Sequence, residues 1–333
     1  MQAMLMTAIG APDVLQLQNI TEPTITQPTQ VKVKLFAAGI NPIDTKLRRG
    51  GLLSAQPLPA ILGCDGAGEI VAIGAAVQGV SVGDAVWFFN GGLGLDAGCY
   101  AQYTVLDERW VAAMPKTLSY AEAAAGPLVL ITAWGALFDR GGLTAGQTVL
   151  IHAGAGGVGH VAIQLAKQQG ARVITTVSGA EKAAFARSLG ADEVIDYQQE
   201  DFAVRVNALT AGKGADLVID TVGAEVFKQS IAATAHFGRL ITLLDPGQLD
   251  LSEARLRNLL IGFELMLTPA LRNLDTARML QITMLNQCAK WIDQGKLRIH
   301  VSQIFPLAEA AAAHSLIEAG HVSGKLVLDI THA

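Results

Sequence analysis

The chain has 333 residues, of which 51% are hydrophobic and 16% are charged, and its formal net charge at pH 7 is −5. This length predicts two domains with separate cores, and the apolar content excludes an intrinsically disordered protein. The mild negative charge does not favour binding to nucleic acid or to an anionic membrane. Because the three cysteines are too scattered for a disulfide framework and no long apolar stretch runs unbroken, we expect a cytoplasmic protein.

The first part of the chain, up to residue 125, has the pattern of a mostly β module. Its apolar runs are short and bounded by turn residues, as in a small barrel. They span 31–40, 69–74, 84–89 and 100–106. Near the other end of the chain, a helical pattern at 275–294 precedes strand-like runs that resemble this module. The first predicted domain therefore comprises residues 1–125 and 268–333.

The segment 126–267 alternates short, strongly apolar runs with helical patterns. The apolar runs span 148–153, 171–177, 193–197, 215–222, 239–244 and 262–267. Strands this apolar are typical of a parallel sheet with helices on both faces. The predicted fold class is therefore α/β, with a doubly wound Rossmann sheet in this segment and a barrel-type β domain in the remainder.

A glycine-rich turn joins the first apolar run of this segment to the helical pattern that follows. It reads Gly154, Ala155, Gly156, Gly157, Val158, Gly159 and fits G-x-G-x-x-G between a strand and a helix. In that context the first glycine allows a tight turn, the second lets the backbone approach a pyrophosphate, and the third permits close helix–strand packing. The positive end of the helix then faces the phosphates. The motif predicts a dinucleotide site, with a purely structural turn as the alternative.

The residues after the second apolar run favour NADP over NAD. An NAD site places Asp or Glu about 20 residues beyond the glycines to bind the ribose 2′-OH, whereas here the strand ends near Ser178 without a carboxylate. Lys182 follows within one turn and can neutralise a 2′-phosphate. The alternative for Lys182 is an ordinary solvent-exposed helix lysine.

Several strings together resemble the zinc-independent quinone oxidoreductase (zeta-crystallin-like) family of medium-chain dehydrogenases/reductases. They include LFAAGINPIDTKLRRG (35–50), LGCDGAGEIVAIG (62–74) and VLIHAGAGGVGHVAIQLAK (149–167). The resemblance covers nearly the whole chain. It implies a GroES-like catalytic domain, a Rossmann domain that binds NADP(H), and a small-molecule substrate in the cleft between them.

The chain also departs from the zinc-dependent members of that superfamily. Those enzymes carry Cys where this chain has Asn41, a His-Glu pair where it has Cys64-Asp65, and a third ligand near Gly126. A catalytic zinc needs three protein ligands, and one thiol cannot hold it. We therefore expect no metal, and hydride delivery from NADPH to an acceptor that is already electrophilic, such as a quinone or an α,β-unsaturated carbonyl.

The resemblance further implies roles for individual residues. Asn41, at the nicotinamide end, would hydrogen-bond the acceptor oxygen, and Asp44 on the same loop is the second candidate catalytic residue. A turn residue and a helix cap are the respective alternatives. The remaining candidates are Ile43, Thr132, Thr221 and Leu244 near the nicotinamide, Ser178, Lys182 and Tyr197 near the 2′-phosphate and adenine, and Lys325 as a second phosphate contact.

Two rival functions remain open at this point. One is reduction of an enoyl thioester or an alkenal, and the other is a non-catalytic NADPH-binding sensor or interaction protein. No residue is identifiable as a general acid, so the physiological acceptor, the proton donor and the number of electrons transferred per step are left open.

The resemblance also implies a homodimer, with the run 262–267 as the sheet edge that pairs.

Overall fold

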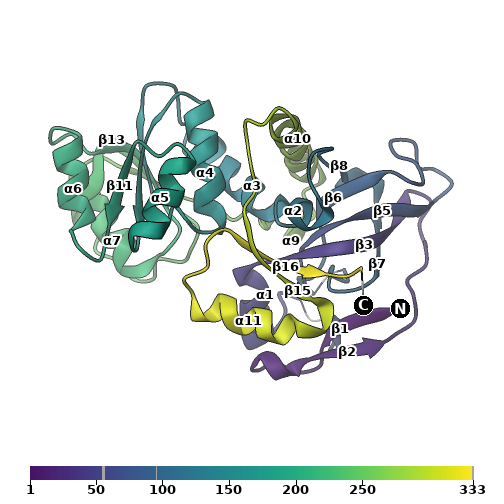
Figure 1. Ribbon diagram of the computed structural model, residues 1–333. Coiled ribbons are helices and arrows are strands. Elements are labelled where there is room, and N and C mark those ends of the chain that lie inside the picture. The colour runs from purple at the N-terminus through teal and green to yellow at the C-terminus, as the bar shows by residue number, and fades with distance from the viewer. Residues whose placement is uncertain (55–56, 95, 332–333) are drawn as a thin grey trace. The chain divides into compact units, whose positions relative to one another are not determined.

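A computed structural model describes residues 1–54, 57–94 and 96–331 of the chain (Figure 1). The chain divides into two compact units. We call them the β unit, which is Met1–Leu128 with Thr268–Ala333, and the α/β unit, which is Val129–Leu267. The domain limits expected from the sequence, after residue 125 and at residue 268, lie close to these divisions.

The β unit is built on a large, mostly antiparallel sheet and a small one. The large sheet has the strand order β15-β16-β3-β5-β6-β8, and β7 also pairs with β3. Its strands are β3 (Gln30–Ile40), β5 (Asp65–Ile73), β6 (Ala85–Phe89), β7 (Tyr103–Asp107), β8 (Ala112–Ala113), β15 (Val301–Pro306) and β16 (Lys325–Asp329). The small sheet, in the order β2-β1-β4, consists of β1 (Gln2–Met6), β2 (Leu15–Asn19) and β4 (Ala60–Ile61). Because β16 pairs with β3, the C-terminal tail completes the large sheet.

Helix α1 (Pro42–Gly50) follows β3 directly and sets the geometry of the loop that the sequence singles out. Pro42 suits the first helical position because its φ is fixed and the N–H it lacks would have no partner there. The Asp44 carboxylate accepts a hydrogen bond from the backbone N–H of Asn41 at 2.8 Å. The other helices of the unit are α2 (Tyr120–Ala124), α9 (Thr268–Leu271), α10 (Asp275–Asp293) and α11 (Ala310–Ala319).

The α/β unit contains a parallel sheet with the strand order β11-β10-β9-β12-β13-β14. Its strands are β9 (Thr148–Ile151), β10 (Arg172–Val177), β11 (Glu193–Asp196), β12 (Ala215–Asp220), β13 (Thr234–Thr242) and β14 (Leu260–Phe263). The chain builds outward from β9 in one direction and then, from β12, in the other. This order confirms the predicted doubly wound Rossmann sheet.

Three helices of the α/β unit pack on the strands that they connect, namely α4 (Gly157–Gln168), α5 (Ala180–Ser188) and α7 (Ala224–Ala233) (Figure 1). Helix α6 (Phe202–Leu209) packs on β11 and α7, and α8 (Ser252–Leu256) packs on α7. Helix α3 (Pro127–Trp134) begins at the unit's edge and is followed by a π-helical turn at Gly135–Arg140. Leu150, Ile174 and Val218 are completely buried in the core beneath them, which explains why these strands are so apolar. None of the described helices is long and apolar enough to cross a membrane.

Strand β14 is shorter than the apolar run 262–267 suggests. It ends at Phe263, after which the Glu264 N–H donates one more bond to the Thr242 carbonyl at 3.0 Å. Met266 and Leu267 are then buried. The apolar run 262–267 therefore combines the end of an edge strand with buried core residues that follow the strand. Hydrophobicity alone does not distinguish the two parts of the run, because both are apolar.

Glu264 is a buried carboxyl group beside the π-helical turn. A Cβ on Gly135 would lie only 2.5 Å from the Glu264 carboxyl carbon, so the turn leaves room for this side chain only because residue 135 is glycine. Burial raises the pKa of Glu264 from 4.5 to about 7, although the Arg140 guanidinium, 3.6 Å away, opposes the rise. Asp139 adds to it.

Because the pKa of Glu264 is raised in the folded protein, we expect the free energy of unfolding to depend on pH. The folded protein keeps the Glu264 proton up to about pH 7, whereas the unfolded chain releases it near 4.5. The folded state therefore binds more protons between these values, and the free energy of unfolding falls as the pH rises through them. Glu264→Gln should make that fall shallower, which thermal unfolding across this pH range measures. Glu225→Gln, which removes an exposed carboxylate of the same unit, is the control, and an equal fall in wild type and Glu264→Gln would contradict the assignment.

Candidate active site

The glycine-rich turn joins β9 to α4 at the carboxyl edge of the parallel sheet. Gly156 precedes α4 and has a φ of −78°, while the left-handed φ of the turn, +50°, falls on Ala153 rather than on a glycine. Helix geometry leaves the N–H groups of the first turn, from Gly157 onward, without intrahelical acceptors. These groups and the positive helix end are suited to an anion.

The three motif glycines are needed for different reasons. A Cβ at Gly154 would fall 2.0 Å from the Thr175 hydroxyl oxygen, and a Cβ at Gly159 would fall 2.2 Å from the Ala153 carbonyl oxygen. At Gly156, by contrast, the nearest atom would be 3.1 Å away. Packing therefore requires Gly154 and Gly159, whereas Gly156 has more space around it, as the close approach of a pyrophosphate to the backbone would require. The tight turn that the sequence assigned to Gly154 is made by Ala153 instead.

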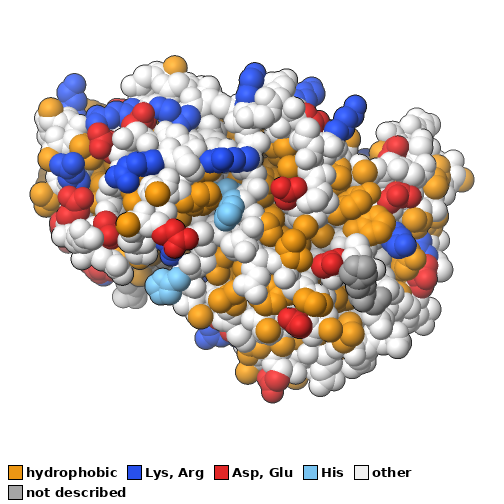
Figure 2. Space-filling model, viewed as in Figure 1, with side chains coloured by type: hydrophobic (Ala, Val, Ile, Leu, Met, Phe, Trp, Pro, Cys, Tyr) orange, Lys and Arg blue, Asp and Glu red, His pale blue; other side chains and the backbone are white. Residues whose placement is uncertain are grey.

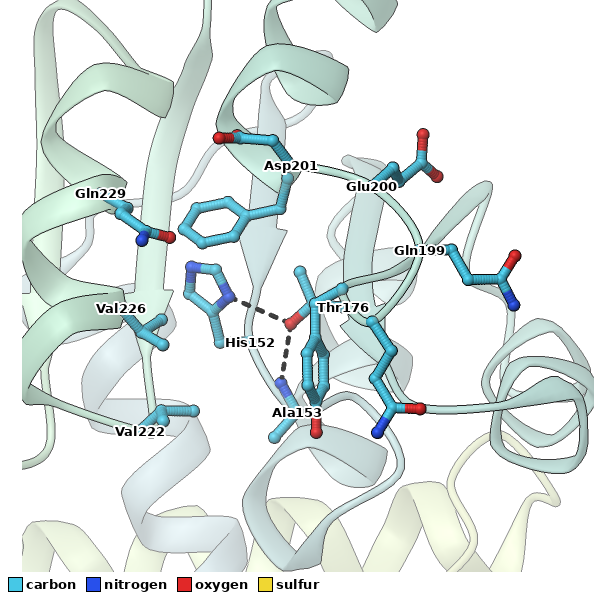
Figure 3. Close-up of a pocket in the computed structure, with 12 residues that line it drawn as sticks. His152, Ala153, Thr176, Gln199, Glu200, Asp201, Val222, Val226 and Gln229 are labelled. Atoms are coloured by element: carbon cyan, nitrogen blue, oxygen red, sulfur yellow. Dashed lines mark hydrogen bonds between the residues drawn. The ribbon is translucent and has the colours of Figure 1, made fainter.

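A pocket of about 570 Å³ lies at the carboxyl ends of β9, β10 and β12 (Figure 3). Ligands bind at this place in doubly wound sheets. The lining combines apolar side chains with amide, hydroxyl, imidazole and two carboxyl side chains: His152, Ala153, Thr176, Tyr197, Gln198, Gln199, Glu200, Asp201, Phe202, Val222, Val226 and Gln229. Apolar walls with a few polar groups suit the nucleoside part of a dinucleotide. On the visible face of the α/β unit, Lys and Arg side chains are interspersed with Asp and Glu side chains (Figure 2).

His152, at the wall of this pocket, has partners for both ring nitrogens. Nε2 lies 2.9 Å from the Ser230 hydroxyl, which itself donates to the Val226 carbonyl, so Nε2 carries the proton. Nδ1 then accepts from the Thr176 hydroxyl at 3.0 Å. Burial lowers the pKa of His152 to about 4. The ring is therefore neutral near pH 7, and its two hydrogen bonds give it a structural role.

The candidates for the 2′-phosphate lie along neighbouring strand ends. Ser178 follows β10, Lys182 is in the first turn of α5, and Tyr197 follows β11, lines the pocket and is 50% exposed. Among the described residues, Lys182 has no ion-pair partner.

Sequence analysis missed Asp196, which lies opposite Val177 in the sheet and whose carboxylate accepts the Gly179 N–H at 3.2 Å. Because it comes from the adjacent strand, only the pairing of β10 with β11 could have revealed it.

Two of the candidates for the nicotinamide end follow strands of the same edge. Thr221, directly after β12, donates its hydroxyl to the His152 carbonyl at 2.9 Å. Leu244 follows β13 and would touch any side chain at Gly223. Thr132 is buried within α3. The structure thus brings Thr221 and Leu244 to the edge that also carries the glycine-rich turn.

In the β unit, Asn41 lies between opposite charges at the start of α1. Its Nδ2 donates to the Asp65 carboxylate at 2.9 Å, and its Oδ1 accepts from the Lys325 ammonium group. Lys325 also donates to the Ile40 carbonyl at 2.8 Å. Asn41 and Asp65 are completely buried and Lys325 is 3% exposed; Ile43, on the same helix, is half-buried. These contacts within the unit occupy Lys325 and do not support the phosphate contact expected of it.

Within the part of the chain that the structure describes, three hydrogen-bond donors hold the Asp44 carboxylate. Its carboxylate accepts from the Asn41 backbone, from the Tyr100 hydroxyl at 3.2 Å and from the Cys64 thiol at 3.7 Å. Burial nevertheless raises the pKa of Asp44 to about 6. The geometry fits the helix cap that the sequence analysis weighed against a catalytic role.

Asp65 completes this cluster. Its second oxygen accepts the Leu128 N–H at 2.9 Å, and burial raises the pKa of Asp65 to about 7 although Lys325 and the Asn41 bond lower it. Burial lowers the pKa of Lys325 in turn. Two of the positions that the resemblance compares with zinc ligands, Asn41 and Cys64-Asp65, are thus joined in a network of protein hydrogen bonds through Asp44.

Comparison with known proteins agrees with this architecture. The family models for an alcohol dehydrogenase GroES-like domain and a zinc-binding dehydrogenase match residues 27–116 and 189–328. The chain is 38% identical over 323 residues to a quinone oxidoreductase of Pseudomonas aeruginosa, covering 96% of this chain and 97% of that protein. It is 32% identical to the chloroplastic NADPH-dependent alkenal/one oxidoreductase of Arabidopsis thaliana, covering 98% and 79%. Escherichia coli quinone oxidoreductase complexed with NADPH has a similar structure, with a TM-score of 0.89 at 28% identity over 99% of this chain and 100% of that one.

The GroES-like and Rossmann parts together define a dehydrogenase/reductase of the medium-chain type. Within that class, the chain belongs to the quinone oxidoreductase family. It is therefore an oxidoreductase whose cofactor is NADP(H).

The packing of the glycine-rich turn predicts different outcomes for two of its glycines. Gly156→Val should keep the fold and lose NADPH binding, because its side chain would fill the space through which a pyrophosphate reaches the backbone. Gly159→Ala should instead lower the melting temperature, because its Cβ would collide with the Ala153 carbonyl oxygen. Fluorescence titration with NADPH and circular dichroism check both outcomes. Normal NADPH binding by folded Gly156→Val would mean that the phosphate-turn assignment is wrong.

Proposed function

We propose that this protein reduces quinones and related α,β-unsaturated carbonyl compounds with NADPH, and that it does so without a metal ion. The observation that carries the proposal is the buried network around Asn41, in which the Lys325 ammonium and the Asp65 carboxylate hydrogen-bond the two ends of a side chain that stands where zinc-dependent relatives carry a metal ligand. Within the described ranges, no three His, Cys, Asp or Glu side chains are grouped to hold a metal ion. At Gly126, a Cβ would lie 2.6 Å from the Trp87 ring, so a ligand side chain has no room there.

Without a metal ion to polarise its carbonyl group, the acceptor must be electrophilic enough by itself to accept a hydride. When bound, NADPH supplies a hydride, which is two electrons and one proton. The chain's contribution is then to orient the acceptor and to stabilise the negative charge that develops on its oxygen. We propose that the Asn41 amide donates a hydrogen bond to that oxygen; because Asn41 is completely buried, the acceptor has to reach it inside the protein. Quinones and enones share this requirement, and similarity to both a quinone oxidoreductase and an alkenal/one oxidoreductase supports including both classes.

For the cofactor, we propose contacts along the edge of the parallel sheet. The glycine-rich turn would hold the pyrophosphate, and the pocket beside it the adenosine. Ser178, Lys182 and Tyr197 would bind the 2′-phosphate. Ile43, Thr132, Thr221 and Leu244 would contact the nicotinamide half.

We also propose that the protein forms a homodimer through β14. This strand is at the edge of its sheet, so one row of its backbone groups is unpaired within the unit. Leu260 and Phe263 on it are 61% and 59% exposed. Pairing of two β14 strands would bury these side chains and satisfy the edge.

The 2′-phosphate role of Lys182 can be tested by cofactor preference. Lys182→Ala should weaken NADPH binding by roughly tenfold, the worth of about one charge-assisted hydrogen bond, and leave NADH binding unchanged. Lys228→Ala, which removes another exposed lysine of the same unit, is the control. Equal effects of Lys182→Ala on NADPH and NADH would rule out the assignment.

The function itself is tested by NADPH and NADH oxidation with 1,4-benzoquinone and with an alkenal, with and without a chelator. We expect turnover that prefers NADPH and is insensitive to the chelator. Loss of activity on chelation would contradict the metal-free mechanism. Tight NADPH binding without turnover of either acceptor would instead favour a sensor or an interaction protein.

A further inference from the structure

The buried charges around Asn41 point to an additional role that deepens the proposed function and rests on it. We propose that Lys325 and Asp65 are positioning residues, which fix the side-chain amide of Asn41 with its N–H₂ group as a donor for the acceptor oxygen. Neither residue needs to touch the acceptor. Their effect is exerted through Asn41.

The two ends of the Asn41 amide are matched to opposite charges. The carbonyl oxygen Oδ1 faces the Lys325 ammonium, and the nitrogen Nδ2 faces the Asp65 carboxylate at 2.9 Å. A rotated amide would place N–H against the ammonium and C=O against the carboxylate, so both contacts would become repulsive. Hydrogen bonds to charged groups are about twice as strong as neutral ones. The two charges therefore select one amide orientation.

The selected orientation leaves a donor for the acceptor. An amide nitrogen carries two hydrogens, and Asp65 takes one from Nδ2. The opposite orientation would offer an oxygen, which repels the negative charge that forms on a reduced carbonyl. Fixing the amide should therefore raise kcat rather than the affinity for NADPH.

The backbone around Asn41 is fixed as firmly as its side chain. Asp44 holds the Asn41 backbone N–H at 2.8 Å. Lys325 holds the carbonyl of the preceding residue, Ile40, at 2.8 Å, and β16 carries Lys325 into place because Leu326 pairs with Ile40. These backbone hydrogen bonds keep the Asn41 side chain between the Lys325 and Asp65 charges.

The test is a double-mutant cycle between Lys325 and Asn41. Lys325→Met, a neutral replacement of similar length, should lower kcat for 1,4-benzoquinone about tenfold and leave the NADPH dissociation constant unchanged. In an Asn41→Ala background, the same replacement should change kcat less than about twofold, because the residue through which it acts is gone. Equal losses in both backgrounds would overturn the proposal.

A second variant separates positioning from stability. Lys325→Met leaves buried carboxylates without their counter-charge, so we pair it with Asp65→Asn to remove both charges. We expect the Asp65→Asn/Lys325→Met protein to regain thermal stability but not kcat. Recovery of kcat together with stability would show that Lys325 serves only the fold.

An NMR measurement keeps the proposal testable if the proposed function fails and wild type reduces neither acceptor. The Asn41 side-chain amide signal, identified by its loss in Asn41→Ala, should exchange its hydrogens with solvent slowly in wild type and faster in Lys325→Met. The Asn207 amide, which donates to the Ala203 and Ala232 carbonyls, is the internal control. Unchanged exchange at Asn41 in Lys325→Met would overturn the positioning role, whatever the activity.

Discussion

A single buried ammonium group joins parts of the β unit that are far apart in the sequence. Lys325 on β16 donates to the carbonyl of Ile40 and to the side chain of Asn41, more than 280 positions earlier. A buried charge without hydrogen-bond partners is strongly unfavourable, so β16 has to remain beside β3 for this lysine to keep its partners. The start of α1, and the amide that it presents, is thus held by a strand from the other end of the chain.

The proposed sites of the two units differ in how the chain forms them. In the α/β unit, glycines allow α4 to approach β9, and the missing side chain at Gly156 leaves space beside N–H groups that have no intrahelical acceptor. In the β unit, charged groups of both signs hydrogen-bond the side-chain amide of Asn41 and fix its orientation.

Much of the fold and part of the site could be predicted from local sequence patterns. The apolar runs located the parallel strands, and the sequence also located the glycine-rich turn between a strand and a helix that we propose as the phosphate site. The end of β14 was missed because hydrophobicity alone does not separate an edge strand from the core residues after it. Asp196 and the bonds of Lys325 were missed because they depend on which strands lie side by side, and pairing between distant segments leaves no periodic signal in the chain.

The discontinuity of the β unit has a consequence for how the protein emerges from the ribosome. The α/β unit is contiguous, from Val129 to Leu267, whereas the β unit lacks β15 and β16 until the last part of the chain has been made. Domains fold as units during synthesis. The α/β unit can therefore complete its structure first, whereas the large sheet of the β unit cannot close until β15 and β16 have been synthesised.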